Sequence, residues 1–333
     1  MNSKLVPIAV WTLAIPFASG CEDGALEPWT HGEGLVAVTA AGYSDWSPAI
    51  NIELASPGSD PSFNTPSLDG CPFTSRDGKT FYMASNRPGG LGGLDIWVST
   101  RARGDDPWGA PVNLEAPVNS SADDFCPTID RDGHRFFFVS RRAIEGSCGG
   151  SDIYVTRLRG NGGFDEPENL GCEVNSALDE AGPFPLPERG SGPVLYFSST
   201  RAGLGAGGDL YRSESHGGAY GPAQLVPGIN STSDDGQPNL RRDGLEIYFY
   251  STRPGPDALG GPDLYVATRA STSAPWSTPV NLGPNVNSAA GETRPSLSWD
   301  GTALYFGSNR PASEAGSADI YVTTRDKLTG SVD

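Results

Sequence analysis

The amino-acid sequence predicts an all-β fold built from five copies of one unit, and three observations support this prediction. Glycine (44 residues) and proline (29 residues) are frequent in the chain of 333 residues, and both residue types disrupt helices. Short apolar runs rich in aromatic and β-branched side chains favour strands. One sequence pattern also returns at a nearly constant interval, which is typical of repeat architectures.

Each repeat carries the pattern N-[ST]-x-x-x-[DE]-x-x-P. The prolines that end it are separated by 55, 56, 55 and 57 residues, and they are Pro72, Pro127, Pro183, Pro238 and Pro295. Chance does not produce five such matches at one interval. The pattern therefore marks the start of five structurally equivalent units.

The elements within one unit follow the proline in a fixed order. In the first unit they are a turn at Asp77-Gly78, an aromatic strand at Phe81-Tyr82-Met83, a Ser85-x-Arg87 motif, a strand opening at Asp95 and a last strand beginning at Trp108. The other units repeat this order, although the third replaces the turn by a longer loop with Arg189-Gly190. The aromatic strands are apolar on both faces, so each must be covered from both sides.

The fifth unit lacks its last strand, and a matching segment precedes the first unit. Trp46-Ser47-Pro48-Ala49-Ile50-Asn51 resembles Trp276-Ser277-Thr278-Pro279-Val280-Asn281, which is the last strand of the fourth unit. We expect the N-terminal strand to complete the C-terminal unit, which closes a ring and leaves no open sheet edge. The prediction is a five-bladed β-propeller of four-stranded antiparallel blades over residues 44–326.

The N-terminus has the features of an export signal. A largely apolar run from Leu5 to Ala18 follows Lys4 and is too short to span a bilayer. The segment Ala18-Ser19-Gly20-Cys21 resembles the lipobox of bacterial lipoproteins. We expect a signal peptide over residues 1–20, lipid attachment at Cys21, a tether over 21–43 and a C-terminal tail over 327–333. The alternative is ordinary cleavage after Gly20, which leaves Cys21 as a free thiol.

Four further cysteines remain once Cys21 is assigned to lipid. Cys71 and Cys126 occupy the same position in neighbouring repeats, whereas Cys148 and Cys172 lie on two loops of one unit. Of the three possible pairings we therefore prefer disulfides Cys71–Cys126 and Cys148–Cys172, which an exported protein would form by oxidation. A zinc site made of the four thiolates is the alternative, although no C-x-x-C spacing is present.

The repeat motifs P-x-x-x-x-D-G, Tyr-Phe-x-Ser-x-Arg and Asp-Ile-Tyr-Val resemble those of the WD40-like β-propeller repeats of the TolB type. The resemblance covers essentially the whole mature chain. It implies a bacterial protein of the periplasm or cell surface, in a family that often provides scaffolds for cell-envelope assemblies. Together with the lipobox, it leads us to expect an exported protein that is lipid-anchored on the periplasmic or cell-surface side of a membrane. TolB has six blades and an additional N-terminal α/β domain, so its role in translocation is not transferred to this chain.

Two sets of repeated charged residues are candidates for structural or binding roles. Arg87 and Asp95, with their equivalents, could form bidentate ion pairs that tie strands within a blade. The acidic residues of the repeat pattern are expected to ring one mouth of the channel, where they could bind a cation or accept local backbone hydrogen bonds. These acidic residues are Asp69, Asp124, Glu180, Asp235 and Glu292.

The net charge and the absence of known catalytic motifs argue against several classes of function. The formal net charge of −17 argues against a nucleic-acid partner, and against membrane contact other than through the lipid. The histidines His31, His134 and His216 form no HExxH motif, and no G-x-S-x-G motif is present. The acidic residues that break the repeat lie on loops, and they are Glu145, Glu188, Asp257 and Glu314.

These observations predict a protein that is not an enzyme and uses no cofactor or metal. The expected function is non-catalytic binding or scaffolding at the bacterial cell envelope, with a protein or peptide partner engaged by loops at the channel mouth. The alternative is a carbohydrate-binding (lectin-like) or glycosidase propeller. A glycosidase requires two carboxylates about 5 to 9.5 Å apart, and five-bladed propellers are known to carry such sites.

Overall fold

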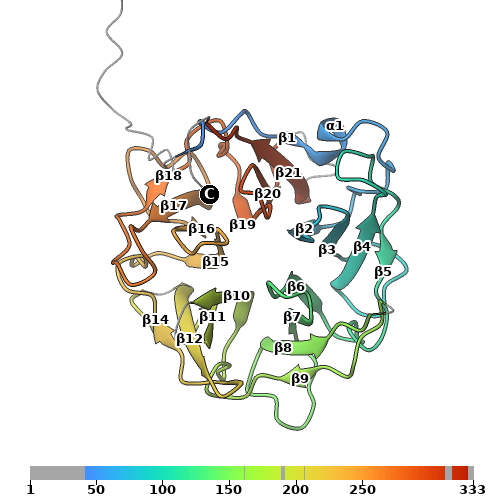
Figure 1. The fold of residues 1–333 in the computed structure, drawn as a ribbon, viewed down its shortest axis with the longest axis vertical. Coiled ribbons are helices and arrows are strands. Elements are labelled where there is room, and N and C mark those ends of the chain that lie inside the picture. Colours follow the sequence, from blue (N-terminus) through green and yellow to red (C-terminus); the bar gives the residue numbers. More distant parts are fainter. Residues whose placement is uncertain (1–41, 161, 189–191, 206, 312–316, 329–333) are drawn as a thin grey trace, which may run out of the picture. The chain divides into compact units, whose positions relative to one another are not determined.

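The computed structural model describes residues 42–160, 162–188, 192–205, 207–311 and 317–328, which all belong to the unit Ala37–Asp333. Five antiparallel sheets follow one another around a ring in this unit, and their innermost strands β2, β6, β10, β15 and β19 face its centre (Figure 1). The prediction of an all-β, five-bladed propeller is therefore confirmed. The predicted signal peptide and Cys21 lie outside the described residues.

Each blade runs outward from its inner strand in chain order. The first contains β2 (Asp69–Thr74), β3 (Thr80–Ser85), β4 (Asp95–Thr100) and β5 (Val112–Asn113). The second contains β6 (Asp124–Ile129), β7 (Arg135–Ser140), β8 (Asp152–Arg157) and β9 (Glu168–Asn169). The third contains β10 (Glu180–Glu188), β11 (Gly192–Ser199), β12 (Asp209–His216), β13 (Ala219–Tyr220) and β14 (Gln224–Leu225), and both short strands pair with β12. The fourth contains β15 (Asp235–Leu240), β16 (Glu246–Ser251), β17 (Asp263–Thr268) and β18 (Val280–Asn281).

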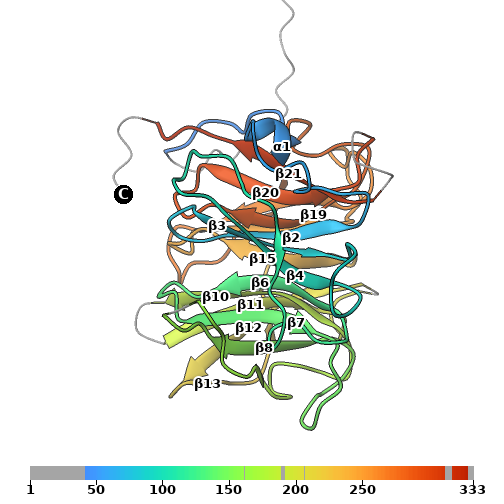
Figure 2. The same ribbon diagram turned by 90° about the vertical axis from the view of Figure 1, so that its right-hand side faces the viewer.

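The fifth blade joins the two ends of the described chain. It contains β19 (Glu292–Leu297), β20 (Ala303–Ser308), β21 (Asp319–Thr324) and the N-terminal strand β1 (Ile50–Asn51), which leads into the helix α1 (Ile52–Ala55). Strand β1 pairs antiparallel with β21, with Ile50 opposite Val322. Figures 1 and 2 both show the blue N-terminal segment beside the dark red β21. The predicted strand exchange is confirmed.

Side chains around the closure reproduce those of an ordinary blade. The guanidinium of Arg325 lies over the ring of Trp46, as that of Arg269 lies over Trp276 in the fourth blade. The distances from guanidinium carbon to ring centroid are 4.5 and 4.2 Å. Trp46 therefore holds the position that the sequence comparison with Trp276 predicts.

Aromatic side chains fill the space between neighbouring blades. Tyr82 of the first blade meets Phe136 of the second with ring centroids 5.3 Å apart, and both belong to one buried cluster with Ile96 and Tyr154. This interface explains why the aromatic strands are apolar on both faces, since each blade is covered by the next one. Among the described residues no helix is long and apolar enough to cross a membrane.

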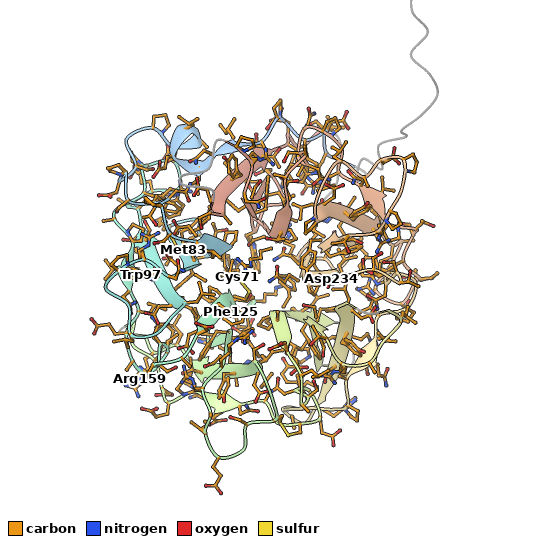
Figure 3. The ribbon with its side chains drawn as sticks, turned by 180° about the vertical axis from the view of Figure 1, so that it is seen from behind. Cys71, Met83, Trp97, Phe125, Arg159 and Asp234 are labelled. Atoms are coloured by element: carbon orange, nitrogen blue, oxygen red, sulfur yellow. A yellow bond between two sulfur atoms is a disulfide. The ribbon has the colours of Figure 1, made fainter. Side chains whose placement is uncertain are left out.

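Every inner strand contains a bulge at its third residue. The register shifts there in all five blades, and the residue adopts a left-handed backbone conformation just before the repeat proline. The five residues and their φ angles are Cys71 (48°), Cys126 (50°), Gly182 (59°), Gln237 (52°) and Arg294 (59°). All five border a small cavity at the centre of the ring, and Figure 3 shows Cys71 near the middle of the ring and Arg159 toward its outer edge.

Both predicted disulfides are present. Cys71–Cys126 joins β2 to β6 across the first two blades, with Cα atoms 4.8 Å apart. Cys148–Cys172 joins two loops of the second blade, with Cα atoms 5.5 Å apart.

The framework ion pairs differ from the predicted ones. Arg87 binds Asp69 of β2 at 2.5 Å and does not pair with Asp95 of β4. Both carboxylates lie beside Ser85, because β3 pairs with β2 on one side and with β4 on the other. The remaining donors of Arg87 reach backbone carbonyl groups such as that of Phe63 on the β2 side, whereas Asp95 accepts hydrogen bonds from its own glycine-rich loop. The sequence alone could not distinguish these two partners.

Candidate functional site

A cavity opens at the end of the ring where the inner strands finish. Its volume is about 590 Å³, and its wall includes residues that follow β2, β6, β15 and β19 and the last part of β10. All five blades contribute one residue from the same position, which follows the repeat proline by four residues, and these are Arg76, Arg131, Pro187, Arg242 and Trp299. We call this space the rim cavity. It is the place where otherwise similar blades present different side chains.

Aromatic side chains form the apolar part of the rim cavity. Phe73, Tyr82 and Phe184 line it together with Trp299. The rings of Phe73 and Tyr82 have centroids 6.4 Å apart. Burial raises the pKa of the Tyr82 hydroxyl to about 12, so the side chain is a neutral hydrogen-bonding group at physiological pH.

Three arginines line the rim cavity, one each from the first, second and fourth blades. Arg76 is exposed and stacks on Trp299, with its guanidinium carbon 4.9 Å from the ring centroid. Arg131 is exposed and has no ion-pair partner among the residues that the structure describes. The third, Arg242, is also exposed. These side chains bring cationic groups to one cavity in a protein of net charge −17.

Three aspartates also line the rim cavity. Asp130 is held by Arg135 at 2.9 Å and accepts the backbone N–H of His134. Asp77 is exposed and accepts the Ser75 hydroxyl at 2.7 Å, a hydrogen bond that lowers the pKa of its carboxyl group. Asp132 is exposed as well. Asp77 and Asp132 are equivalent residues on the turns of adjacent blades, so two carboxylates face the same space.

The cavity at the centre of the ring is much smaller, with a volume of about 30 Å³. Phe73 lines both spaces, so the channel centre adjoins the rim cavity. The Cys71–Cys126 disulfide forms one side of it. The Gln237 amide donates to the sulfur of Cys126 at 3.6 Å. We call this space the channel centre.

Arg294 occupies the channel centre without a carboxylate partner. Its side chain lies over Gly70, where an added Cβ would be only 2.7 Å from Nη1, so this glycine makes room for the guanidinium. The Nε atom is shielded from water and has no hydrogen-bond partner, and the same is true of the Gln237 Oε1 atom. Burial lowers the pKa of the Arg294 guanidinium. Within the described part of the chain, Arg294 forms no ion pair.

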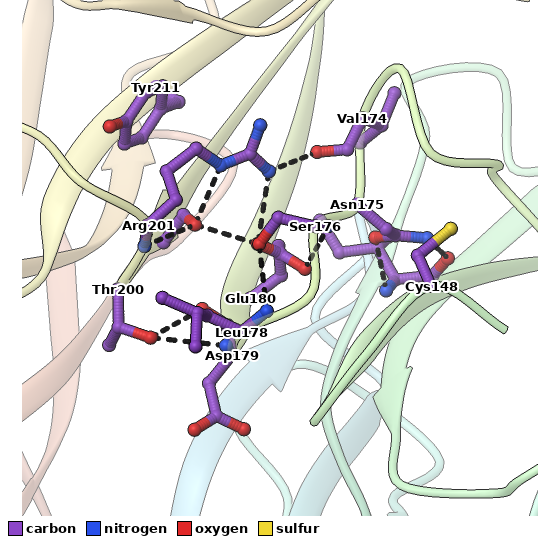
Figure 4. Close-up of polar contacts among 12 residues, drawn as sticks. Cys148, Val174, Asn175, Ser176, Leu178, Asp179, Glu180, Thr200, Arg201 and Tyr211 are labelled. Carbon is purple, nitrogen blue, oxygen red and sulfur yellow. Dashed lines mark hydrogen bonds and ion pairs between the residues drawn. The ribbon is translucent and has the colours of Figure 1, made fainter.

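The five acidic residues of the repeat pattern have no exposure to solvent. Each accepts hydrogen bonds from the Ser or Thr four residues earlier and binds the Ser-x-Arg arginine of its own blade; in the third blade, Ser176 and Arg201 both contact Glu180 (Figure 4). The five arginine–carboxylate distances lie between 2.5 and 3.1 Å, and the pairs are Arg87–Asp69, Arg142–Asp124, Arg201–Glu180, Arg253–Asp235 and Arg310–Glu292. These carboxylates hold each blade together.

The other candidate residues are not brought to the rim cavity. Glu145 and Asp257 are exposed on loops and do not line it. Glu188 ends β10, and its side chain is not described, while Glu314 lies outside the described residues. In the portion of the chain that the structure covers, no three His, Cys, Asp or Glu side chains are grouped as metal ligands would be.

Sequence reasoning missed the residues that line both cavities. Arg76, Arg131, Arg242 and Trp299 fill the variable position just before the Asp-Gly turn, and Gln237 and Arg294 fill the variable position just before the repeat proline. The signal that could have identified them is that the residue type at these two positions varies among the repeats. Positions that differ among repeats of a closed ring meet at one place, whereas the constant positions form the framework.

Comparison with known proteins identifies the fold. No protein-family model and no curated protein sequence matches the chain. Solved structures do resemble it, among them a thermostable family-43 glycoside hydrolase (13% identity, 82% of this chain, 93% of that chain, TM-score 0.54). Others are an α-L-arabinofuranosidase from Lactobacillus brevis (12%, 81%, 93%, 0.54) and an endo-arabinase from Bacteroides thetaiotaomicron (17%, 82%, 99%, 0.52). At these identities the likeness shows a shared five-bladed propeller, and it does not single out the TolB type.

The same comparison corrects the functional prediction. Most of the similar structures are glycoside hydrolases and arabinases, which contradicts the prediction of a non-catalytic scaffold with a protein partner and favours its carbohydrate alternative. The prediction relied on the exposed acidic residues that break the repeat, and these do not line the rim cavity. The exposed carboxylates that do line it, Asp77 and Asp132, follow the repeat.

Proposed function

We propose that this protein binds a carbohydrate in the rim cavity and hydrolyses a glycosidic bond there. The observation that carries the proposal is that charged and aromatic side chains from several blades surround two exposed carboxylates in one cavity. The fold that the chain shares with glycoside hydrolases supports it.

The composition of the wall suits a sugar. Small-molecule sites are typically mainly apolar clefts with a few convergent polar groups, and the volume of about 590 Å³ is within the range for such sites. Sugar rings have apolar faces that can pack on aromatic rings such as Trp299 and Phe184, while their hydroxyl groups need hydrogen-bonding partners such as Asp77 and Tyr82. The rim cavity offers both kinds of contact.

Hydrolysis requires two carboxyl groups on either side of the glycosidic bond. One donates a proton to the departing oxygen, which leaves as a hydroxyl group, and the other assists the attack on the anomeric carbon, to which water finally supplies its oxygen. Asp77 suits the second role, since its hydrogen bond with Ser75 favours the ionised form. Asp132 on the adjacent turn supplies the other carboxyl group.

Substituting Asp77→Asn is expected to reduce the release of new reducing ends by about 10² or more, the usual effect of losing such a group. The assay uses arabino-, xylo- and galacto-oligosaccharides together with oligogalacturonides. Asp300→Asn is the matched control, because Asp300 also accepts a serine hydroxyl at 2.7 Å, from Ser298, but does not line the rim cavity.

Two results would contradict the proposal. If the unmodified protein released no reducing ends from any of these oligosaccharides, it would not be a hydrolase for them. If Asp77→Asn and Asp300→Asn reduced the rate equally, the effect would come from the turn and the site would be misplaced.

We also propose that the protein is exported and lipid-anchored through Cys21, with blades of the WD40-like TolB type. The repeat motifs and the sequence Ala18-Ser19-Gly20-Cys21 support this, as do the two disulfides, which are typical of proteins outside the cytoplasm. Cys21→Ser is expected to move the protein from the membrane fraction to the soluble fraction of fractionated bacterial cells. Retention of that variant in the membrane fraction would refute a lipid anchor.

A further inference from the structure

Arg294 differs from the other arginines that lie inside the propeller. Arg87 and the four equivalent arginines each bind a buried carboxylate, and Arg325 binds Glu246 at 3.0 Å. Arg269 instead donates to backbone carbonyl groups. No carboxylate and no carbonyl group in the described residues accepts from Arg294, and its Nε atom is both buried and unpartnered.

An unpaired Nε–H at such a place is destabilising, because burial removes its solvation and no acceptor replaces the lost water. A buried polar group without a partner therefore calls for an explanation, such as a bound group. Gly70 on the first inner strand leaves room for the Arg294 side chain, because a Cβ atom at position 70 would lie only 2.7 Å from Nη1. The channel centre thus presents a cationic group to whatever enters from the rim cavity.

Gln237 places a second unpartnered polar atom in the channel centre. Its amide nitrogen donates to the sulfur of Cys126 at 3.6 Å, which leaves Oε1 as a buried acceptor without a donor. An anion alone would satisfy Arg294 but not this oxygen. A group that carries a carboxylate beside a hydroxyl satisfies both, since the carboxylate accepts from Arg294 and the hydroxyl donates to Gln237.

The volumes of the two cavities suit a ligand whose ring lies in the rim cavity and whose substituent enters the channel centre. The channel centre holds about 30 Å³, close to the share of one water molecule in the liquid, so it admits a substituent but not a sugar ring. The rim cavity, at about 590 Å³, has room for the ring itself. Arg76 and Arg131 at the rim can also bind acidic groups of a ligand whose ring lies in this cavity.

We propose that the carbohydrate bound by this protein is acidic, and that a uronic-acid carboxylate binds Arg294 at the channel centre while an adjacent hydroxyl group donates to Gln237. The identity of the ligand as a carbohydrate rests on the proposed function. The assignment of a carboxylate rests on Arg294 and Gln237 and does not depend on hydrolysis.

The test is calorimetric binding of trigalacturonate and of neutral galactotriose to the whole protein. The unmodified protein is expected to bind trigalacturonate about 10- to 100-fold more tightly, the range for a charge-assisted hydrogen bond. Arg294→Gln is expected to remove this preference. Its melting temperature should be equal to or above that of the unmodified protein, because an unpaired charge is removed. The control, Arg103→Gln, removes an exposed arginine that lines neither cavity.

Each result decides the question. Equal affinity for the two trisaccharides would overturn the inference and leave a neutral carbohydrate as the ligand of the proposed function. Binding of neither would overturn the acidic-sugar inference, while hydrolysis of any other oligosaccharide in the panel would still support the proposed function. A preference that survives Arg294→Gln would assign the carboxylate to the rim arginines, and an equal loss in Arg103→Gln would show a non-specific charge effect.

Discussion

Deletion of residues 45–53 is expected to open the ring and to lower the melting temperature by on the order of 10 °C or more. The deleted segment contains β1 and most of the contacts that join the N-terminal segment to β21. Ile52 is 2% exposed and packs with Phe63 and Phe81 of the first blade. Loss of one such side chain costs about 2 to 5 kcal/mol, and each kilocalorie corresponds to about 2 to 4 °C in a domain of this size class.

Polar contacts add to this loss. The Ser47 backbone N–H donates to the carbonyl of Thr324 at 2.8 Å, and the Asn285 amide donates to the carbonyl of Trp46 at 2.8 Å. Removal of the segment also exposes the edge of β21, which can pair with other molecules. The deletion variant is therefore expected to aggregate on heating.

Calorimetry or circular dichroism measures the transition, and two substitutions provide the matched comparison. Ile52→Ala removes a buried side chain of α1, whereas Leu54→Ala removes one that is 72% exposed in the same helix. We expect a clear decrease for the first and almost none for the second. A deletion variant that melts at the unmodified temperature would show that the ring does not depend on this closure.

Replacing Arg87 by methionine is expected to reduce the free energy of unfolding by about 3 to 5 kcal/mol, because it leaves the Asp69 carboxylate buried without its cation. Asp69 is 0% exposed and Arg87 is 8% exposed. The substitution also removes the donors that bind the Phe63 and Ser62 carbonyl groups at 2.9 and 2.7 Å. Denaturation in urea measures the change.

An exposed pair provides the control. Arg159 binds Asp165, and the two side chains are 55% and 44% exposed, so Arg159→Met should cost no more than about 1 kcal/mol. Adding Asp69→Asn to Arg87→Met should recover part of the loss, since it removes the uncompensated charge. Equal small effects of Arg87→Met and Arg159→Met would mean that the buried pair does not hold the blade.

The candidate site shows how far periodic sequence information extends. The repeat pattern identifies Asp77 as a turn residue of the first unit but gives no role to Arg76 beside it. Its contact with Trp299 joins the first and fifth blades, which are more than 200 residues apart in the sequence. Nothing in the local pattern of either blade indicates this meeting, because it depends on how the ring closes.

The lack of a partner for Arg294 cannot be recognised from its position in the repeat. The sequence places it in the position that Cys71 and Cys126 hold in other blades, but the absence of an acceptor is a property of the whole channel centre. Among the described residues, five inner strands contribute to this space, and none supplies a carboxylate there. Whether Arg294 finds a partner therefore depends on all five inner strands together.

Comparison of one repeat with the next predicts the number of blades and the exchange of the N-terminal strand, and it favours the two disulfide pairings that are present. These features repeat at a constant interval or occupy equivalent positions in neighbouring repeats. The three-dimensional arrangement was needed to show that Arg87 binds Asp69, that five equivalent residues surround one cavity, and that the Nε atom of Arg294 has no partner at its base. These depend on which side chains meet across sheets and between blades, and such distances are set by packing around the ring.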